Sequence, residues 1–195
     1  MKLKYIELVL LDVDGVLIDS KLNMKKSWDK LLSEKYVEIP FYEYFKRIGT
    51  SFENIMADMG IKKNIKKIKR EYFKNSLQFK DKIKAYKTVN TTLLKLQKKY
   101  ILGIVTSKRK KNTKYFLKKF FPKVNFSLVC VPSPKLKSKP APDLLKFAFK
   151  KYKIKSKNSV YVGDTLNDLI ASKRAKTNFV LAKYGYNNKN LKCKF

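Results

Sequence analysis

LLDVDGVL, residues 10–17, is the stretch that decides the fold of this 195-residue chain. It begins inside an apolar, β-prone run, residues 5–11, which predicts a buried strand. Asp12, Asp14 and Gly15 follow where that strand ends, so two carboxylates and a flexible turn lie at the carboxyl edge of a sheet. Ligands bind at this edge in α/β proteins.

The residues of this stretch leave two interpretations open. Asp12 and Asp14 repel each other unless a hard cation such as Mg²⁺ lies between them. A carboxylate held against such a cation can attack phosphorus and form an aspartyl-phosphate. The alternative is an ordinary strand followed by an Asp-Gly turn.

Two later segments add groups that suit a phosphate. A second strand pattern, residues 100–105, ends in Thr106 and Ser107. Hydroxyl and N–H groups at such a strand end suit a phosphate oxygen, although Thr-Ser is also an ordinary helix cap. Lys139 opens the sequence KPAPD, residues 139–143, whose prolines end one element and begin the next. Taken alone, Lys139 fits an ordinary solvated surface charge as well as it fits a phosphate-binding group, because the chain is so basic.

A third strand pattern, residues 159–163, is followed directly by Asp164. Thr165 and Asp168 have the spacing of a capping box, so a purely structural role is open for Asp168. No capping role of this kind accounts for Asp164. Further strand patterns near residues 126–131 and 178–182 alternate with helical ones, which predicts a parallel sheet.

Taken in this order, the four segments resemble the haloacid dehalogenase-like superfamily of phosphohydrolases, and most closely its phosphoglycolate phosphatase and β-phosphoglucomutase-like branch. They read DVDGVLIDS, TSK, KPAPD and VGDTLND. The resemblance implies an α/β fold: a Rossmann-like parallel sheet flanked by helices, with an inserted α-helical cap. The expected boundaries are a catalytic core of residues 1–18 and 85–195, and a cap of residues 19–84.

The resemblance also implies catalytic roles. Asp12 would be the nucleophile, and Asp14 would be the general acid and then the base. Thr106 and Ser107 would bind the phosphoryl group, and Lys139 would bind it too while neutralising charge on Asp12.

The implied cofactor is Mg²⁺. Its ligands would be Asp12, the backbone carbonyl of Asp14, and Asp164. Asp168 would support the metal through another ligand or through water.

Residues 19–84 carry helical patterns, and TSFE at residues 50–53 predicts a capping box that opens one helix. In the family branch, a loop of the cap reaches over the active site. Arg47 lies where such a loop would be and would grip a second anionic group of the substrate. An ordinary surface arginine is the alternative.

The chain has 47 basic and 15 acidic residues, a net charge of +32. Such a charge normally indicates nucleic acid or an anionic membrane. Only four of the basic residues are arginines, however, and the lysines are spread along the whole chain. Nucleic-acid readers favour arginine for its planar fork, so we interpret the charge as a compositional bias towards lysine.

Other features of the composition narrow the classes of protein. The chain is 44% hydrophobic, which indicates a globular protein. It has no histidine, which excludes catalytic triads that use histidine and metal sites with histidine ligands. No apolar run is long enough to cross a membrane. Cys130 and Cys193 are too few for a disulfide framework, so a cytoplasmic location is expected. We expect a monomer or a weak homodimer.

These observations predict a Mg²⁺-dependent phosphatase that hydrolyses a small phosphomonoester, similar to phosphoglycolate or a sugar phosphate, through an aspartyl-phosphate. One alternative is a phosphomutase, in which a sugar hydroxyl replaces water as the acceptor. Another is a basic protein associated with nucleic acid, or a polynucleotide phosphatase, on the same scaffold.

Overall fold

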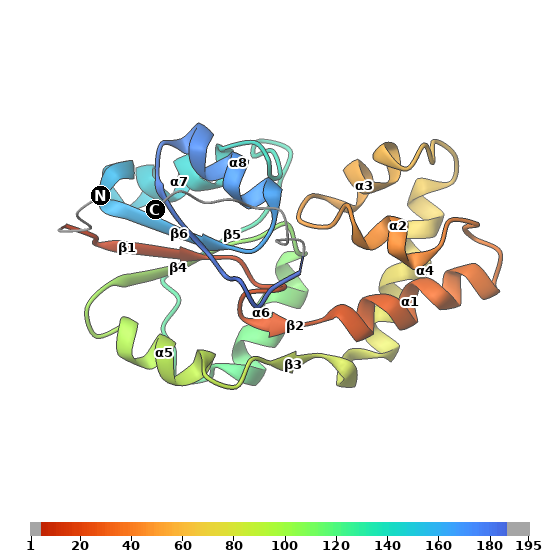
Figure 1. Ribbon diagram of the computed structural model, residues 1–195, viewed down its shortest axis with the longest axis horizontal. Coiled ribbons are helices and arrows are strands. Elements are labelled where there is room, and N and C mark those ends of the chain that lie inside the picture. The colour runs from red at the N-terminus through yellow and green to blue at the C-terminus, as the bar shows by residue number, and fades with distance from the viewer. Residues whose placement is uncertain (1–4, 187–195) are drawn as a thin grey trace.

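A five-stranded parallel sheet forms the centre of the computed structural model, which describes residues 5–186 (Figure 1). Its strands are β1 (Leu8–Leu11), β4 (Ile101–Val105), β5 (Leu128–Cys130), β6 (Ser159–Gly163) and β7 (Asn178–Leu181), in the order β5-β4-β1-β6-β7. The chain builds outward from β1 first on one side and then on the other. The carboxyl end of β1 therefore lies where the strand order reverses, a common place for a ligand site.

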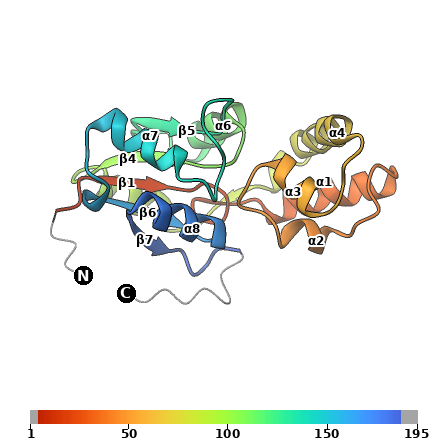
Figure 2. The same ribbon diagram turned by 90° about the horizontal axis from the view of Figure 1, so that it is seen from above.

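Helices cover both faces of the sheet (Figures 1 and 2). They are α5 (Val89–Leu96) and α6 (Lys110–Phe120) on one face, and α7 (Asp143–Tyr152) and α8 (Leu166–Ala175) on the other, with a short 3₁₀ turn, η2 (Ser156–Asn158), before β6. Alternate residues of β1 serve the two layers: Val9 and Leu11 pack towards α5 and α6, and Leu8 and Leu10 towards α7 and α8. Burial on both faces explains why this strand reads as a continuous apolar run.

A helical insertion separates β1 from β4. It contains α1 (Lys21–Ser33), α2 (Phe41–Phe45), α3 (Phe52–Asp58), α4 (Ile65–Gln78) and a 3₁₀ turn, η1 (Lys80–Lys82). An antiparallel pair of two-residue strands, β2 (Ile18–Asp19) and β3 (Lys84–Ala85), joins it to the sheet. The insertion has a hydrophobic core of its own around Trp28, which is fully buried and stacks on Tyr44.

The predicted α/β fold with a parallel sheet flanked by helices is confirmed. The four later strands lie where their patterns predict them, with ends shifted by at most two residues, and β1 begins at Leu8 instead of Tyr5. The division into two domains at residues 18/19 and 84/85 stays a prediction. No helix between residues 5 and 186 is long and apolar enough to cross a membrane. Cys130 is buried in β5, and Cys193 lies outside the described residues.

The start of α3 differs from its prediction. Ser51 is the N-cap, and its hydroxyl accepts from the backbone N–H of Asn54, so the capping box between Thr50 and Glu53 is wrong. The Thr50 hydroxyl donates instead to the backbone carbonyl of Lys139, at 2.5 Å. A tertiary contact to the sheet has therefore replaced the local cap.

Candidate active site

Three acidic side chains converge at the carboxyl edge of the sheet. Asp12 follows β1, Asp164 follows the neighbouring strand β6, and Asp168 lies in the first turn of α8. One carboxylate oxygen from each lies within 4.8 Å of the others, and all three side chains are buried. Parallel pairing of β1 with β6 brings together acids that are 152 residues apart in the chain.

Lys139 is the buried cation of this cluster, and only 1% of it is exposed. Its Nζ donates to Asp12 Oδ2 at 2.6 Å, to Asp168 Oδ1 at 2.5 Å and to the Tyr161 hydroxyl at 3.1 Å. Burial alone would lower the pKa of Lys139, but the two carboxylates raise it above its ordinary value. The ammonium therefore stays charged next to Asp12.

One ammonium does not balance three buried carboxylates. Burial raises the pKa of Asp12 to about 6, although Lys139 opposes the change. Burial, followed by the charges of Asp168 and Asp12, raises the pKa of Asp164 to about 8. Asp168 is different, because Lys139, Thr165 and Tyr161 overcome the effect of burial and hold its pKa below the ordinary value. Additional positive charge beside Asp12 and Asp164 would favour their ionised forms.

The oxygens of Asp164 fit a cation. Oδ2 accepts from the backbone N–H of Tyr186 at 2.6 Å, whereas Oδ1 is buried and has no hydrogen-bond partner among the described residues. A buried unpaired carboxylate oxygen is costly, and a hard cation prefers such ligands. Asp12 and Asp164 are therefore the side chains that could hold Mg²⁺.

Both carboxylate oxygens of Asp168 accept hydrogen bonds from other residues of the protein. Oδ1 accepts from Lys139 and from the Tyr161 hydroxyl, and Oδ2 accepts from the backbone N–H and the hydroxyl of Thr165. The capping box with Thr165 is present, as the spacing predicts. Asp168 thus holds both Lys139 and the start of α8 in place, and its predicted contribution to a metal site can only be indirect.

The turn after Asp14 requires a glycine. Gly15 has φ +81°, a conformation that other residues rarely adopt. A Cβ at this position would lie 2.0 Å from Asp164 Oδ2. The glycine therefore lets the loop after β1 approach the loop after β6.

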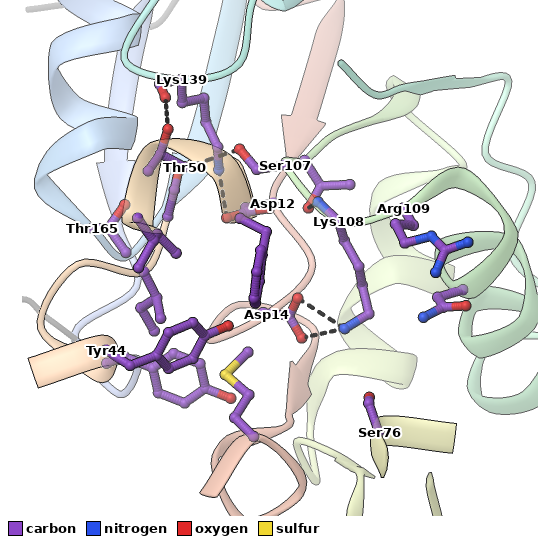
Figure 3. A pocket seen from close by; sticks show the side chains of 18 of the residues that line it. Asp12, Asp14, Tyr44, Thr50, Ser76, Ser107, Lys108, Arg109, Lys139 and Thr165 are labelled. Atoms are coloured by element: carbon purple, nitrogen blue, oxygen red, sulfur yellow. Dashed lines mark hydrogen bonds and ion pairs between the residues drawn. The ribbon is translucent and has the colours of Figure 1, made fainter. Parts of the chain in front are cut away.

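Asp14 does not join the buried acidic cluster. Its carboxylate lies 2.9 and 3.0 Å from the Nζ of Lys108 and 2.5 Å from the hydroxyl of Ser20. In Figure 3, Lys108 extends toward Asp14, whereas Lys139 points to Asp12. The metal contact predicted for Asp14 would be made by its backbone carbonyl, and it stays a prediction.

A cavity of about 100 Å³ lies between the sheet edge and the insertion. Its lining includes the predicted residues Asp12, Asp14, Thr106, Ser107 and Lys139 (Figure 3). Residues of the insertion, among them Tyr44, Gly49, Thr50, Phe52 and Tyr72, close its other side. The structure thus brings five of the predicted side chains to one cavity.

Of the other predicted site residues, Asp164 and Asp168 lie in the buried acidic cluster without lining this cavity, and Arg47 belongs to neither. Its Nη1 donates to the backbone carbonyl and to the carboxylate of Glu43, one helical turn earlier, both at 2.7 Å. The basic side chains in the lining are Lys108 and Arg109 in addition to Lys139. Arg109 lies over the ring of Phe73, 4.5 Å from its centroid, and has no carboxylate partner within the described part of the chain.

Sequence reasoning missed Lys108 and Arg109. The available signal was their position directly after Thr106 and Ser107 at a predicted strand end. In a chain with 47 basic residues, this signal was obscured by the general charge.

The profile of the haloacid dehalogenase-like hydrolases matches residues 9–182. A phosphoglycolate phosphatase of Aquifex aeolicus (strain VF5) is 27% identical over 188 residues, which cover 91% of this chain and 85% of that protein.

Solved structures share the fold. A Bacteroides fragilis protein assigned to the haloacid dehalogenase-like hydrolases superposes with a TM-score of 0.84 at 22% identity, over 92% of this chain and 89% of its own. CbbY of Rhodobacter sphaeroides, solved in complex with phosphate, gives a TM-score of 0.79 at 17% identity, over 96% and 90% of the two chains. The family match spans nearly the whole sheet and its helical insertion, and the chain belongs to the haloacid dehalogenase-like hydrolases.

Proposed function

We propose that this hydrolase is a Mg²⁺-dependent phosphatase of small phosphomonoesters that works through an aspartyl-phosphate on Asp12. The observation that carries the proposal is the buried ammonium of Lys139 on Asp12, with an unpaired carboxylate oxygen of Asp164 in the same cluster. Such a site combines a nucleophilic oxygen, a fixed positive charge and two candidate ligands for a cation. Mg²⁺ held by Asp12 and Asp164 would add positive charge where the phosphoryl group carries negative charge.

In the first step, a carboxylate oxygen of Asp12 bonds to phosphorus while the bond from phosphorus to the substrate oxygen breaks. Lys139 neutralises charge on Asp12 and on the phosphoryl oxygens, and Thr106 and Ser107 bind those oxygens. Asp14 gives a proton to the departing alcohol. In the second step, Asp14 takes a proton from water as the water attacks phosphorus, which releases phosphate and restores Asp12.

The cavity supports a small substrate with an anionic tail. Its volume of about 100 Å³ suits a small substrate. An adjoining cleft of about 620 Å³ shares Lys108 and Arg109 with it and is lined further by Lys69, Lys110 and Lys111. A carboxylate or a second phosphate would be favoured there. The Aquifex relative, named as a phosphoglycolate phosphatase, supports the same class of substrate.

A panel of phosphomonoesters, assayed for phosphate release with Mg²⁺ and with EDTA, tests the proposal. We expect release that requires Mg²⁺ and is lost in Asp12→Asn, and a preference for substrates with a second anionic group. Measuring isomer formation from sugar phosphates in the same samples separates hydrolysis from phosphoryl transfer to a hydroxyl. Full activity in Asp12→Asn would refute the proposal.

A further inference from the structure

The loop after β7 returns to the catalytic edge of the sheet. The backbone N–H of Tyr186 donates to Asp164 Oδ2 at 2.6 Å. A Cβ at Gly185 would lie 2.3 Å from the Cβ of Asp164 and 2.6 Å from the carbonyl oxygen of Gly15. The absence of a side chain at residue 185 therefore allows the loop to pack directly against two catalytic segments.

The hydroxyl of Tyr186 reaches the junction between the sheet and the insertion. It accepts from the backbone N–H of Ser20 at 2.6 Å and donates to Asp19 Oδ1 at 3.1 Å. Burial raises the pKa of Tyr186 above its ordinary value, so this hydroxyl keeps its proton.

Ser20 connects Tyr186 to Asp14. Ser20 occupies the N-cap of α1, yet its hydroxyl makes no capping hydrogen bond to that helix. The hydroxyl donates instead to Asp14 Oδ1 at 2.5 Å. The usual capping interaction is therefore given up for a contact with the proposed acid and base.

The ring of Tyr186 also contacts the insertion. Its centroid lies 5.2 Å from that of Phe45 in α2, and the ring packs against the hydrophobic core of the insertion. One side chain thus touches α2, the junction that precedes α1, and the serine that holds Asp14.

We propose that Tyr186 is a positioning residue that orients Asp14 through Ser20 while the insertion is packed against the sheet. The inference rests on the proposed function, because it assigns Asp14 the proton transfer. The Tyr186 hydroxyl fixes the backbone of Ser20, and that backbone fixes the direction from which the serine hydroxyl meets Asp14. Without it, the proton donor would sample orientations in which the transfer to the leaving oxygen is poor.

Tyr186→Phe tests the inference with two substrates. The variant removes only the hydroxyl and keeps the ring on Phe45 and the backbone N–H on Asp164. Phosphoglycolate has a poor leaving oxygen that needs a proton, whereas 4-nitrophenyl phosphate releases a stable anion. We expect kcat/KM to fall about tenfold for phosphoglycolate, and by less than about twofold for 4-nitrophenyl phosphate.

Tyr184→Phe is the matched control. Its hydroxyl belongs to the same loop but donates to the backbone carbonyl of Val16, with no contact to Ser20 or Asp14. We expect both values of kcat/KM to stay within about twofold of wild type.

Ser20→Ala is a second test of the connection between Tyr186 and Asp14. It should show the same selective loss on phosphoglycolate, and adding Tyr186→Phe to it should cost little more, because both changes break one connection. If Tyr186→Phe is poorly folded, Ser20→Ala alone still tests the contact with Asp14 through which Tyr186 would act.

Two results would overturn the inference. Equal losses on both substrates, or additive losses in the double variant, would show that Tyr186 acts on general stability and not on proton transfer. A wild-type protein that releases phosphate from neither substrate would instead refute the proposed function itself.

Discussion

Replacing Lys139 by methionine should strongly destabilise the protein. Lys139 lies between Asp12 and Asp168, 2.6 and 2.5 Å from their oxygens, and both carboxylates are buried. Methionine has a similar length but no charge, so the change leaves two buried carboxylates that repel each other. Breaking a buried ion pair by removing one partner costs roughly 3–5 kcal/mol.

This loss is a large fraction of the total stability of a domain of this size, about 5–15 kcal/mol. It can be measured by urea unfolding followed by far-UV circular dichroism, in EDTA so that no cation compensates for the missing ammonium. The matched control is Lys114→Met, an exposed lysine in the middle of α6, for which we expect a change within about 0.5 kcal/mol.

A double variant tests the same electrostatic reasoning. Adding Asp12→Asn to Lys139→Met removes one of the two stranded charges, so the double variant should be more stable than Lys139→Met alone. A loss below about 1 kcal/mol in Lys139→Met, or a double variant less stable than the single one, would refute the electrostatic reasoning.

Three further predictions concern the cation, the substrate and the support of Lys139. Mg²⁺ at a hundredfold excess over its dissociation constant should raise the free energy of unfolding by about 2.7 kcal/mol, and Asp164→Asn should abolish this gain in a urea titration. Arg109→Gln should raise KM for phosphoglycolate roughly threefold to tenfold. Arg47→Gln should change KM by less than about twofold, because the guanidinium of Arg47 is paired with Glu43 of α2; equal effects of the two variants on KM would contradict the assignment. Tyr161→Phe removes a buried hydroxyl that donates to Asp168 and should cost about 1–2 kcal/mol in the same unfolding assay; an unchanged midpoint would count against its role.

The acidic cluster was predictable because it depends on features that a sequence states directly. Asp12 and Asp164 each follow an apolar run, and parallel strands place their carboxyl ends on one edge. The capping box of Thr165 and Asp168 is a local interaction set by spacing alone. For these residues, the periodicity of burial and the order of the strands carry the information.

The contacts between the insertion and the sheet were not predictable in the same way. Thr50 has the spacing of a helix cap, but its hydroxyl bonds to the backbone of Lys139. Arg47 has the predicted place in the chain, but its guanidinium is paired with Glu43 and does not line the cavity. The position of Tyr186 depends on where the loop after β7 returns. The outcomes for Thr50 and Tyr186 are decided by tertiary packing, which local patterns do not encode, whereas Arg47 is paired locally with Glu43.

The most direct test of the account is to identify the group that becomes phosphorylated. The protein is mixed with phosphoglycolate and Mg²⁺, quenched in acid during turnover, digested and examined by peptide mass spectrometry. The account predicts a phosphoryl group on Asp12 in the wild type and none in Asp12→Asn. Turnover with phosphate carried by another residue, or by no residue at all, would contradict it.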